Sequence, residues 1–482
     1  MTSETTHGPA ALNLSVIDPE ARKPVEARAD VDYGVVRRLR RQVAERLADK
    51  LVALRVGRRV DVHPEDRGML ARALIDDAVA DWVNQRVRDH EPAPSPAEED
   101  ATTAAVFAAL FGLGRLQEWV TDPQVENIDV NGCDEVWISY AGGRLVRAPA
   151  VADSDDELIE MVQSFAAYLG QTTREFSSAR PLLNLRLPDG ARLSAWMAVT
   201  PRPGLTIRRH RLTDIGLDDL QALGTIDTGL AAFLRAAVHA RKSIVVTGGV
   251  NAGKTTLVRA LANEFDPHER LVVIEKEYEL ALDRLPERHH QVVCMESRDA
   301  NAEGSGEVAL ATLVVHALRM NPRRIIVGEV RGDELIPMLT AMGSGNDGSL
   351  CTLHANSAHA AFTRMAAIGL SSPQKLPTEA THLLAADAVD FVVHLQLVDD
   401  TARGGTRERF VATVLEVTGI GENGRISTNA VYRAGPDGRA VPGTAVACLD
   451  DLMRAGFDPG FLEAPAGWWE SRASTASMGS ER

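Results

Sequence analysis

Glycines, a lysine and two threonines follow an apolar run near the middle of the chain, in a pattern that suits phosphate binding. Residues 248–255 read Gly-Gly-Val-Asn-Ala-Gly-Lys-Thr and fit the pattern G-x-x-x-x-G-K-[S/T]. Glycines let the backbone curl so that successive N–H groups face a phosphate, and the N-terminus of the following helix adds positive potential. The Lys254 amine is expected to reach the β- and γ-phosphate oxygens, and the Thr255 hydroxyl to bind Mg²⁺. The predicted triphosphate site comprises Gly248, Gly249, Val250, Asn251, Ala252, Gly253, Lys254, Thr255 and Thr256.

The glycine-rich loop alone does not distinguish a kinase, a GTPase and a motor ATPase. The class of reaction is therefore inferred from the acidic residues that follow the loop in the chain. Residues 324–329 read Arg-Ile-Ile-Val-Gly-Glu, which predicts a strand ending in a Walker B acid, Glu329. Such a carboxylate orients the attacking water or acts as its base. Gly328 stands where an Asp usually precedes this residue, so we assume no direct bond from this strand to Mg²⁺.

Two more apolar segments end in residues that could take part in a nucleotide site, a glutamate and a histidine. Residues 272–275 end in Glu275, a candidate for the outer shell of the metal, although a solvated strand end is almost as compatible with the spacing. Residues 349–354 end in His354. At the carboxyl edge of a parallel sheet, where ligands bind, such a histidine is a candidate sensor of the γ-phosphate.

These residues require a mostly parallel sheet to bring them together. From about residue 220 to 398, strand-like and helix-like segments alternate, which predicts an α/β fold with helices on both faces of the sheet. The segments predicted as strands are 243–247, 271–275, 292–295, 325–328, 349–354 and 390–397.

The rest of the chain divides into smaller parts. Apolar residues recur every three or four positions in two segments after residue 30, which predicts a helical module, and a Pro-rich stretch follows it. The predicted parts are a disordered arm (1–30), the helical module with its linker (31–100), a smaller α/β domain (101–215), the domain of the glycine-rich loop (216–400), a β-hairpin extension (401–465) and a frayed tail (466–482).

The charge balance argues against nucleic acid and anionic lipid as partners. The chain has 52 Lys and Arg against 67 Asp and Glu, a formal charge of −15. The arginines of residues 37–41 form a local basic cluster, which we interpret as a solvated helix face. No apolar run is long enough for a membrane helix and no signal peptide is evident, so we expect a cytoplasmic protein that contacts membranes only through partners.

Taken together, these motifs resemble the type II/IV secretion ATPases, most closely the CpaF/TadA-like ATPases of tight-adherence (Flp) pili. The resemblance covers roughly residues 107–418. Besides the glycine-rich loop, it is carried by Leu-Phe-Gly-Leu-Gly at 110–114, Asn-Ile-Asp-Val-Asn-Gly at 127–132, Leu-Pro-Asp-Gly-Ala-Arg at 187–192, Thr-Ile-Arg at 206–208, Gly-Glu-Val-Arg at 328–331 and His-Ala-Asn-Ser at 354–357.

The resemblance implies a ring-shaped hexamer on the cytoplasmic side of a membrane, in which ATP binds between an α/β domain and a RecA-like domain. Closure of this cleft would move an inner-membrane platform protein. Two arginines would face the phosphates, where a planar cation neutralises charge in the transition state. The implied roles are Walker A for Lys254 and Thr255, the acidic box for Glu275, Walker B for Glu329, the His box for His354, and phosphate-facing arginines for Arg192 and Arg208.

The sequence departs from this family in two places. The loop interior is Val-Asn-Ala where much of the family has Thr-Gly-Ser, and Lys276 stands where the acidic box usually continues with Asp. Glu277 is then a candidate for the second acidic role. Four-cysteine zinc insertions occur in some relatives, and we expect none here.

Three functions fit the motifs. The first is an ATP-hydrolysing motor for pilus assembly or protein secretion. The second is a RecA-like nucleic-acid translocase, which would use the arginine cluster to grip phosphates and would lose affinity steeply with salt. The third is a regulatory ring component that binds ATP without turning it over.

Overall fold

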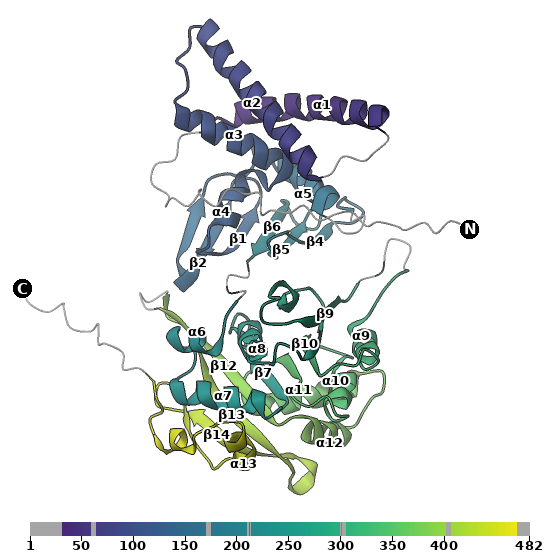
Figure 1. The fold of residues 1–482 in the computed structure, drawn as a ribbon, viewed down its shortest axis with the longest axis vertical. Helices are drawn as coiled ribbons and strands as arrows, with labels where there is room; N and C mark the ends of the chain where they lie inside the picture. The colour runs from purple at the N-terminus through teal and green to yellow at the C-terminus, as the bar shows by residue number, and fades with distance from the viewer. Residues whose placement is uncertain are drawn as a thin grey trace, which may run out of the picture. The chain divides into compact units, whose positions relative to one another are not determined.

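The computed structural model describes residues 31–58, 64–169, 175–209, 212, 214–298, 300, 305–401 and 406–469. The chain forms two compact units, one ending at Arg211 and one starting at Leu212 (Figure 1). The arm predicted for residues 1–30 lies outside the described residues, as do residues 470–482 of the predicted tail. In the described part of that tail, the Trp468 backbone N–H donates to Asp227 Oδ2 at 2.6 Å, so the chain is anchored there.

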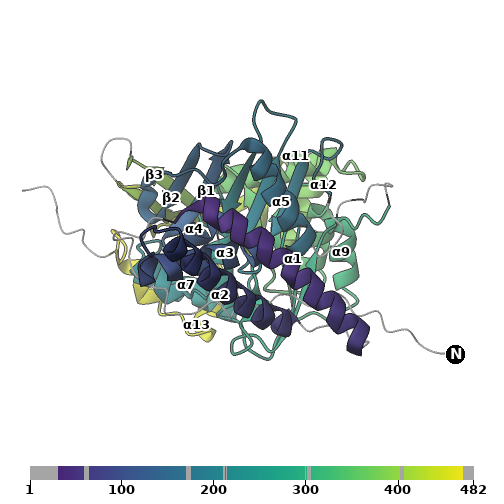
Figure 2. The ribbon, with the colours of Figure 1, turned by 90° about the horizontal axis from the view of Figure 1, so that it is seen from above.

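The first unit begins with a bundle of α1 (Tyr33–Arg58), α2 (Pro64–Arg88) and α3 (Pro96–Phe111) (Figure 2). The predicted apolar face of α1 is buried against α2, with Val43 and Ala78 both fully inaccessible. The helix α3 starts inside the segment predicted as a linker, because Ser95 caps it and Glu98 completes a capping box.

The described residues of the first unit also form an antiparallel six-stranded sheet, with the order β3-β2-β1-β6-β5-β4. Leu158 and Phe165 of α5 are buried in one core with Ile128 and Leu193 of the sheet. The elements are α4 (Gln117–Thr121), β1 (Val125–Asn131), β2 (Val136–Tyr140), β3 (Leu145–Ala148), α5 (Asp155–Leu169), β4 (Leu182–Arg186), β5 (Arg192–Trp196) and β6 (Gly204–Arg208).

The second unit is built on a nine-stranded sheet of described residues, with the order β15-β14-β13-β12-β7-β11-β10-β8-β9. The strands from β12 to β9 in this order are parallel, and β13, β14 and β15 add an antiparallel extension. The strands are β7 (Ile244–Gly248), β8 (Arg270–Glu275), β9 (Gln291–Glu296), β10 (Arg324–Val330), β11 (Leu350–His354), β12 (Phe391–Asp399), β13 (Arg407–Ile420), β14 (Ile426–Ala434) and β15 (Ala440–Pro442).

Helices cover both faces of this sheet, so the predicted α/β fold is confirmed. Successive residues of β7 point into different cores, Val246 into one with α6, α7 and α8, and Val245 into another with α9 to α12. The helices are α6 (Leu217–Ala222), α7 (Thr228–His239), α8 (Lys254–Ala262), α9 (Leu310–Ala317), α10 (Leu335–Met342), α11 (Ala358–Ser371), α12 (Thr378–Ala388) and α13 (Leu449–Arg454). Among the described helices, none has the length and apolarity to cross a membrane.

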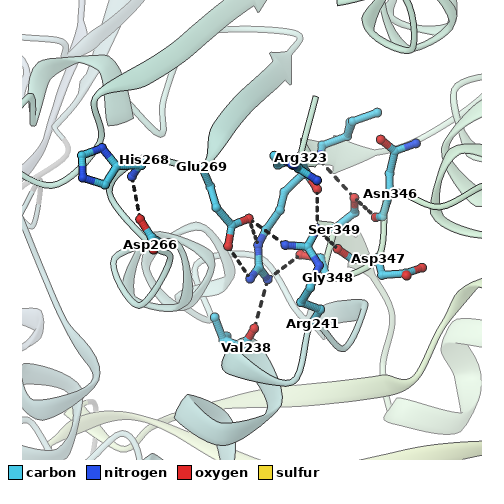
Figure 3. A network of polar contacts seen from close by, with 12 residues as sticks. Val238, Arg241, Asp266, His268, Glu269, Arg323, Asn346, Asp347, Gly348 and Ser349 are labelled. Atoms are coloured by element: carbon cyan, nitrogen blue, oxygen red, sulfur yellow. Dashed lines mark hydrogen bonds and ion pairs between the residues drawn. The ribbon is translucent and has the colours of Figure 1, made fainter. Parts of the chain in front are cut away.

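A buried ion pair fastens the amino-terminal edge of the sheet (Figure 3). Arg324, the first residue of β10, forms a bidentate pair with Glu269 at 2.8 and 3.0 Å. The same guanidinium donates to the carbonyls of Val238 and Gly348. Four segments thus meet at one cation, which fixes the strands whose opposite ends carry the predicted site.

Candidate active site

The glycine-rich loop joins β7 to α8, as predicted. All of β7 is buried, and α8 begins at Lys254. Gly248 and Gly253 have φ angles of 155° and 95°, and a Cβ on Gly248 would lie 2.6 Å from the Leu395 carbonyl oxygen. Asn251 also has a positive φ, 60°, which asparagine tolerates better than most residues. The loop conformation therefore depends on positive φ angles at Gly248, Asn251 and Gly253, and at Gly248 it also depends on the absence of a side chain.

Lys254 is buried beside this loop and donates in three directions. Its Nζ lies 3.2 Å from the Gly248 carbonyl oxygen, 2.8 Å from that of Gly249 and 3.2 Å from Nδ1 of His354. An ammonium group is only a donor, so Nδ1 of His354 is the acceptor and its proton resides on Nε2. Burial, followed by the charge of Lys254, lowers the pKa of His354, which keeps the ring in this neutral form.

Glu329 lies next to the other ring nitrogen of His354. Nε2 of His354 lies 2.9 Å from Oε1 of Glu329, and Nη2 of Arg331 lies 2.6 Å from Oε2. Burial raises the pKa of Glu329, but the hydrogen bond and charge of Arg331 outweigh it, and the net pKa lies below the ordinary value. An ionised carboxylate of lowered pKa is a weak base, so this arrangement favours orienting a water over removing its proton.

The sheet register explains why these three predicted residues meet. His354 on β11 pairs with Gly248 on β7, and β10 lies on the other side of β11. Lys254, His354 and Glu329 consequently lie in polar contact, one after another, at the carboxyl edge of the sheet. Thr255 and Thr256 lie half-buried in the first turn of α8, and a role for either in binding Mg²⁺ or phosphate stays a prediction.

Glu275 is buried at the end of β8, where it holds the loop that follows. Its two oxygens accept the backbone N–H groups of Glu279 and Leu280 at 3.1 and 3.0 Å. Gly328 on the neighbouring strand makes room for it, because a Cβ there would lie 2.8 Å from Glu275 Cγ. The space of the usual Walker B aspartate is thus filled by Glu275. Its predicted place in the outer shell of the metal stays a prediction.

Arg259 on α8 belongs to the same substructure and was missed by the sequence reasoning. It is 2% exposed, and its guanidinium donates to the carbonyls of Leu280 at 3.1 Å, Glu279 at 2.8 Å and Leu212. Residues 279 and 280 are therefore held by Glu275 through their N–H groups and by Arg259 through their carbonyls. The only sign of this role in the sequence is that Arg259 is a charged residue within the otherwise apolar part of the predicted helix.

Arg192 and Arg208 lie in the first unit, on β5 and β6. They are direct partners across these antiparallel strands, so their side chains share one face and one end of the sheet. Arg208 is exposed and Arg192 is partly buried. Their predicted contact with phosphates stays a prediction.

The donor set at the loop fits a magnesium–triphosphate complex. The curled backbone, the Lys254 amine and the first turn of α8 offer N–H groups and a cation to phosphate oxygens. The Thr255 hydroxyl, in the first turn of α8, offers an oxygen ligand of the kind that Mg²⁺ prefers.

Known proteins of similar sequence come from secretion and conjugal-transfer systems. The family model described as type II/IV secretion system protein matches residues 112–437, more than half of the chain. A protein of Mycobacterium tuberculosis H37Rv, provisionally named a conjugal transfer protein, is 33% identical over 355 residues, 72% of this chain and 94% of that protein. VirB11 of the Brucella suis type IV secretion system is 31% identical over 324 residues, 62% of this chain and 88% of that protein. The crystal structure of the Brucella suis VirB11 ATPase in complex with sulphate has 29% identity and a TM-score of 0.33, covering 65% of this chain and 96% of that chain.

Proposed function

Because the chain belongs to the family of type II/IV secretion system proteins, we propose that it is an ATPase that powers pilus assembly or protein secretion. The observation that carries the proposal is the series of close polar contacts from Lys254 to Nδ1 of His354 and from Nε2 of His354 to Glu329. It joins a phosphate-binding amine to an ionised carboxylate at the edge of a parallel sheet where ligands bind. A phosphate sensor placed between these two groups responds to both.

The geometry suggests how the residues would work in turnover. For Nζ of Lys254 to bind a phosphate oxygen, it must give up at least one of its present acceptors, which include Nδ1 of His354. Losing the bond to His354 frees Nδ1, and the ring is then able to turn or to take up a proton. Either change alters the 2.9 Å contact between Nε2 of His354 and Glu329. We infer that phosphate binding at Lys254 is thereby reported to the water-orienting carboxylate.

Mg²⁺, when bound through Thr255, would neutralise charge on the phosphates. Glu329 would orient the attacking water with an oxygen now shared with His354 or Arg331. Arg192 and Arg208, from the first unit, would contact the phosphates as the family resemblance implies. Glu275 would support the site through the loop at 279 and 280.

The finer assignments are also part of the proposal. We place the chain with the CpaF/TadA-like ATPases of tight-adherence pili, on the motifs at 328–331 and 354–357. We expect a homo-oligomer, by resemblance a hexamer, at the cytoplasmic face of the inner or plasma membrane. Its partners would be inner-membrane platform proteins of a pilus or secretion system, and it would contact the membrane only through them.

ATP hydrolysis by purified wild type, Lys254→Ala and Glu329→Ala tests the proposal. Both changes should reduce turnover by orders of magnitude, since they remove a phosphate ligand and a water-positioning group. Lys242→Ala is a matched control, because Lys242 pairs with Asp451 at the other end of β7. Hydrolysis that neither Lys254→Ala nor Glu329→Ala impairs would exclude the assignment.

The translocase alternative depends on the basic cluster of α1, which the structure does not favour as a nucleic-acid site. Arg37 of this cluster pairs with Asp153 and Glu157, so these acids neutralise part of the charge of the cluster. Arg46, further along α1, lies 3.7 Å from Asp81. DNA binding that weakens steeply with salt would revive this alternative.

A further inference from the structure

An arginine from the C-terminal hairpin lies against the phosphate-binding loop. Arg409 is on β13, which pairs with β12, and β12 in turn pairs with β7. Its Nε donates to the carbonyl oxygen of Asn251 at 2.9 Å. Its Cδ is 3.7 Å from the place of a Cβ on Gly253, so the aliphatic stem covers the end of the loop. The side chain thus binds the loop at Asn251 and lies next to Gly253.

The hydrogen bond from Arg409 orients one peptide unit of the loop. The peptide between Asn251 and Ala252 is trans, so its carbonyl and its N–H point in opposite directions. With the Asn251 carbonyl directed to Arg409, the Ala252 N–H is directed away from it. Phosphate-binding loops work by aiming N–H groups at the phosphate, so the direction of each peptide unit matters to affinity.

The charge of Arg409 also lies beside the loop. A guanidinium stays protonated at any physiological pH, and at hydrogen-bond distance from the loop it adds to the positive potential there. A second arginine, Arg407, lies two residues away on the same strand. Arg407 binds Asp399 within the hairpin, with both Nε and Nη2 at 2.7 Å, and its charge is neutralised there.

We propose that Arg409 is a positioning residue for the phosphate-binding loop, and that the β12–β13 hairpin contributes to the nucleotide site through this one side chain. The inference rests on the proposed ATPase function and extends it to a region that the motifs leave without a role. Arg409 holds the Asn251–Ala252 peptide in its phosphate-binding direction and contributes charge to triphosphate affinity.

The test compares full-length wild type with Arg409→Ala, Arg409→Lys and Arg407→Ala. The Kd for a fluorescent ADP analogue is measured by titration with Mg²⁺ present, and KM and kcat for ATP by phosphate release. Arg409→Ala should raise Kd and KM roughly tenfold, the equivalent of one hydrogen bond to a charged group, with kcat changed less than about twofold. Arg409→Lys, which keeps the charge, should recover part of the affinity. Arg407→Ala should match wild type.

Two results would overturn the inference. The first is a Kd for Arg409→Ala equal to that of wild type. The second is an equal rise for Arg407→Ala, which would assign the effect to the hairpin in general. Lys254→Ala separates this inference from the function: a normal Arg409→Ala beside an inactive Lys254→Ala refutes the role of Arg409 alone, whereas an active Lys254→Ala refutes the ATPase assignment.

Discussion

The substitution Gly328→Ala tests how tightly Glu275 is packed against β10. In Gly328→Ala the new Cβ would lie 2.8 Å from Cγ, 3.0 Å from Oε1 and 3.3 Å from Cδ of Glu275. Glu275 is 4% exposed and both its oxygens accept backbone N–H groups, so it has no free direction in which to move. We expect the overpacking to lower the free energy of unfolding by about 1–3 kcal/mol.

A double-mutant cycle assigns this loss to the contact with Glu275. The three nearest atoms to the added methyl all belong to Glu275, so in a Glu275→Ala background Gly328→Ala should cost less than about 0.5 kcal/mol. Gly332→Ala is the matched control, since its nearest atom is Glu334 Oε2 at an ordinary 3.7 Å. Equilibrium urea unfolding, followed by circular dichroism, gives the free energies. An equal loss in both backgrounds would refute the steric explanation.

Two further predictions concern buried ionisable side chains. His289 is 4% exposed, and burial, followed by the charge of Arg288, lowers its pKa from 6.5 to about 4. The unfolded chain therefore binds the proton first as pH falls. Between pH 6.5 and pH 5 the free energy of unfolding of wild type, measured with urea, should fall by about 1.5 kcal/mol relative to that of His289→Gln. Parallel pH profiles of the two proteins would contradict this. Arg324→Gln leaves Glu269 with one of its two arginine partners and should lower the free energy of unfolding by about 3–5 kcal/mol, because the pair is buried. Arg241→Gln should lower it by about 1 kcal/mol or less, because the Arg241 side chain is 37% exposed. Similar losses in unfolding free energy for the two arginines would show that burial does not set the strength of this pair.

Local sequence signals predict most elements of the second unit. The strands β7, β8, β10 and β11 are apolar runs with polar ends, and each lies within one or two residues of its predicted bounds. Periodicity also predicts α1, whose apolar face is buried. The predicted linker is too long at its end because the start of α3 depends on a capping box at Ser95, a signal that the proline-rich context obscures.

The site is predictable only as far as its motifs reach. Lys254, Glu329 and His354 each end or follow a recognisable strand, and parallel pairing brings them together. The contact of Arg409 with Asn251 joins residues 158 positions apart and depends on β12 lying next to β7, which no local pattern specifies. The same holds for the Glu275 carboxylate, because its bonds depend on the path of a loop.

A single-turnover experiment with Glu329→Gln tests the central chemistry most directly. The amide keeps the size of the side chain and removes the charge that Arg331 and His354 now contact. With enzyme in excess over radiolabelled ATP and Mg²⁺ present, we predict that the variant binds ATP with an affinity close to that of wild type and cleaves it at least about 100-fold more slowly. Cleavage at the wild-type rate would contradict the assignment of Glu329 as the residue that orients the attacking water.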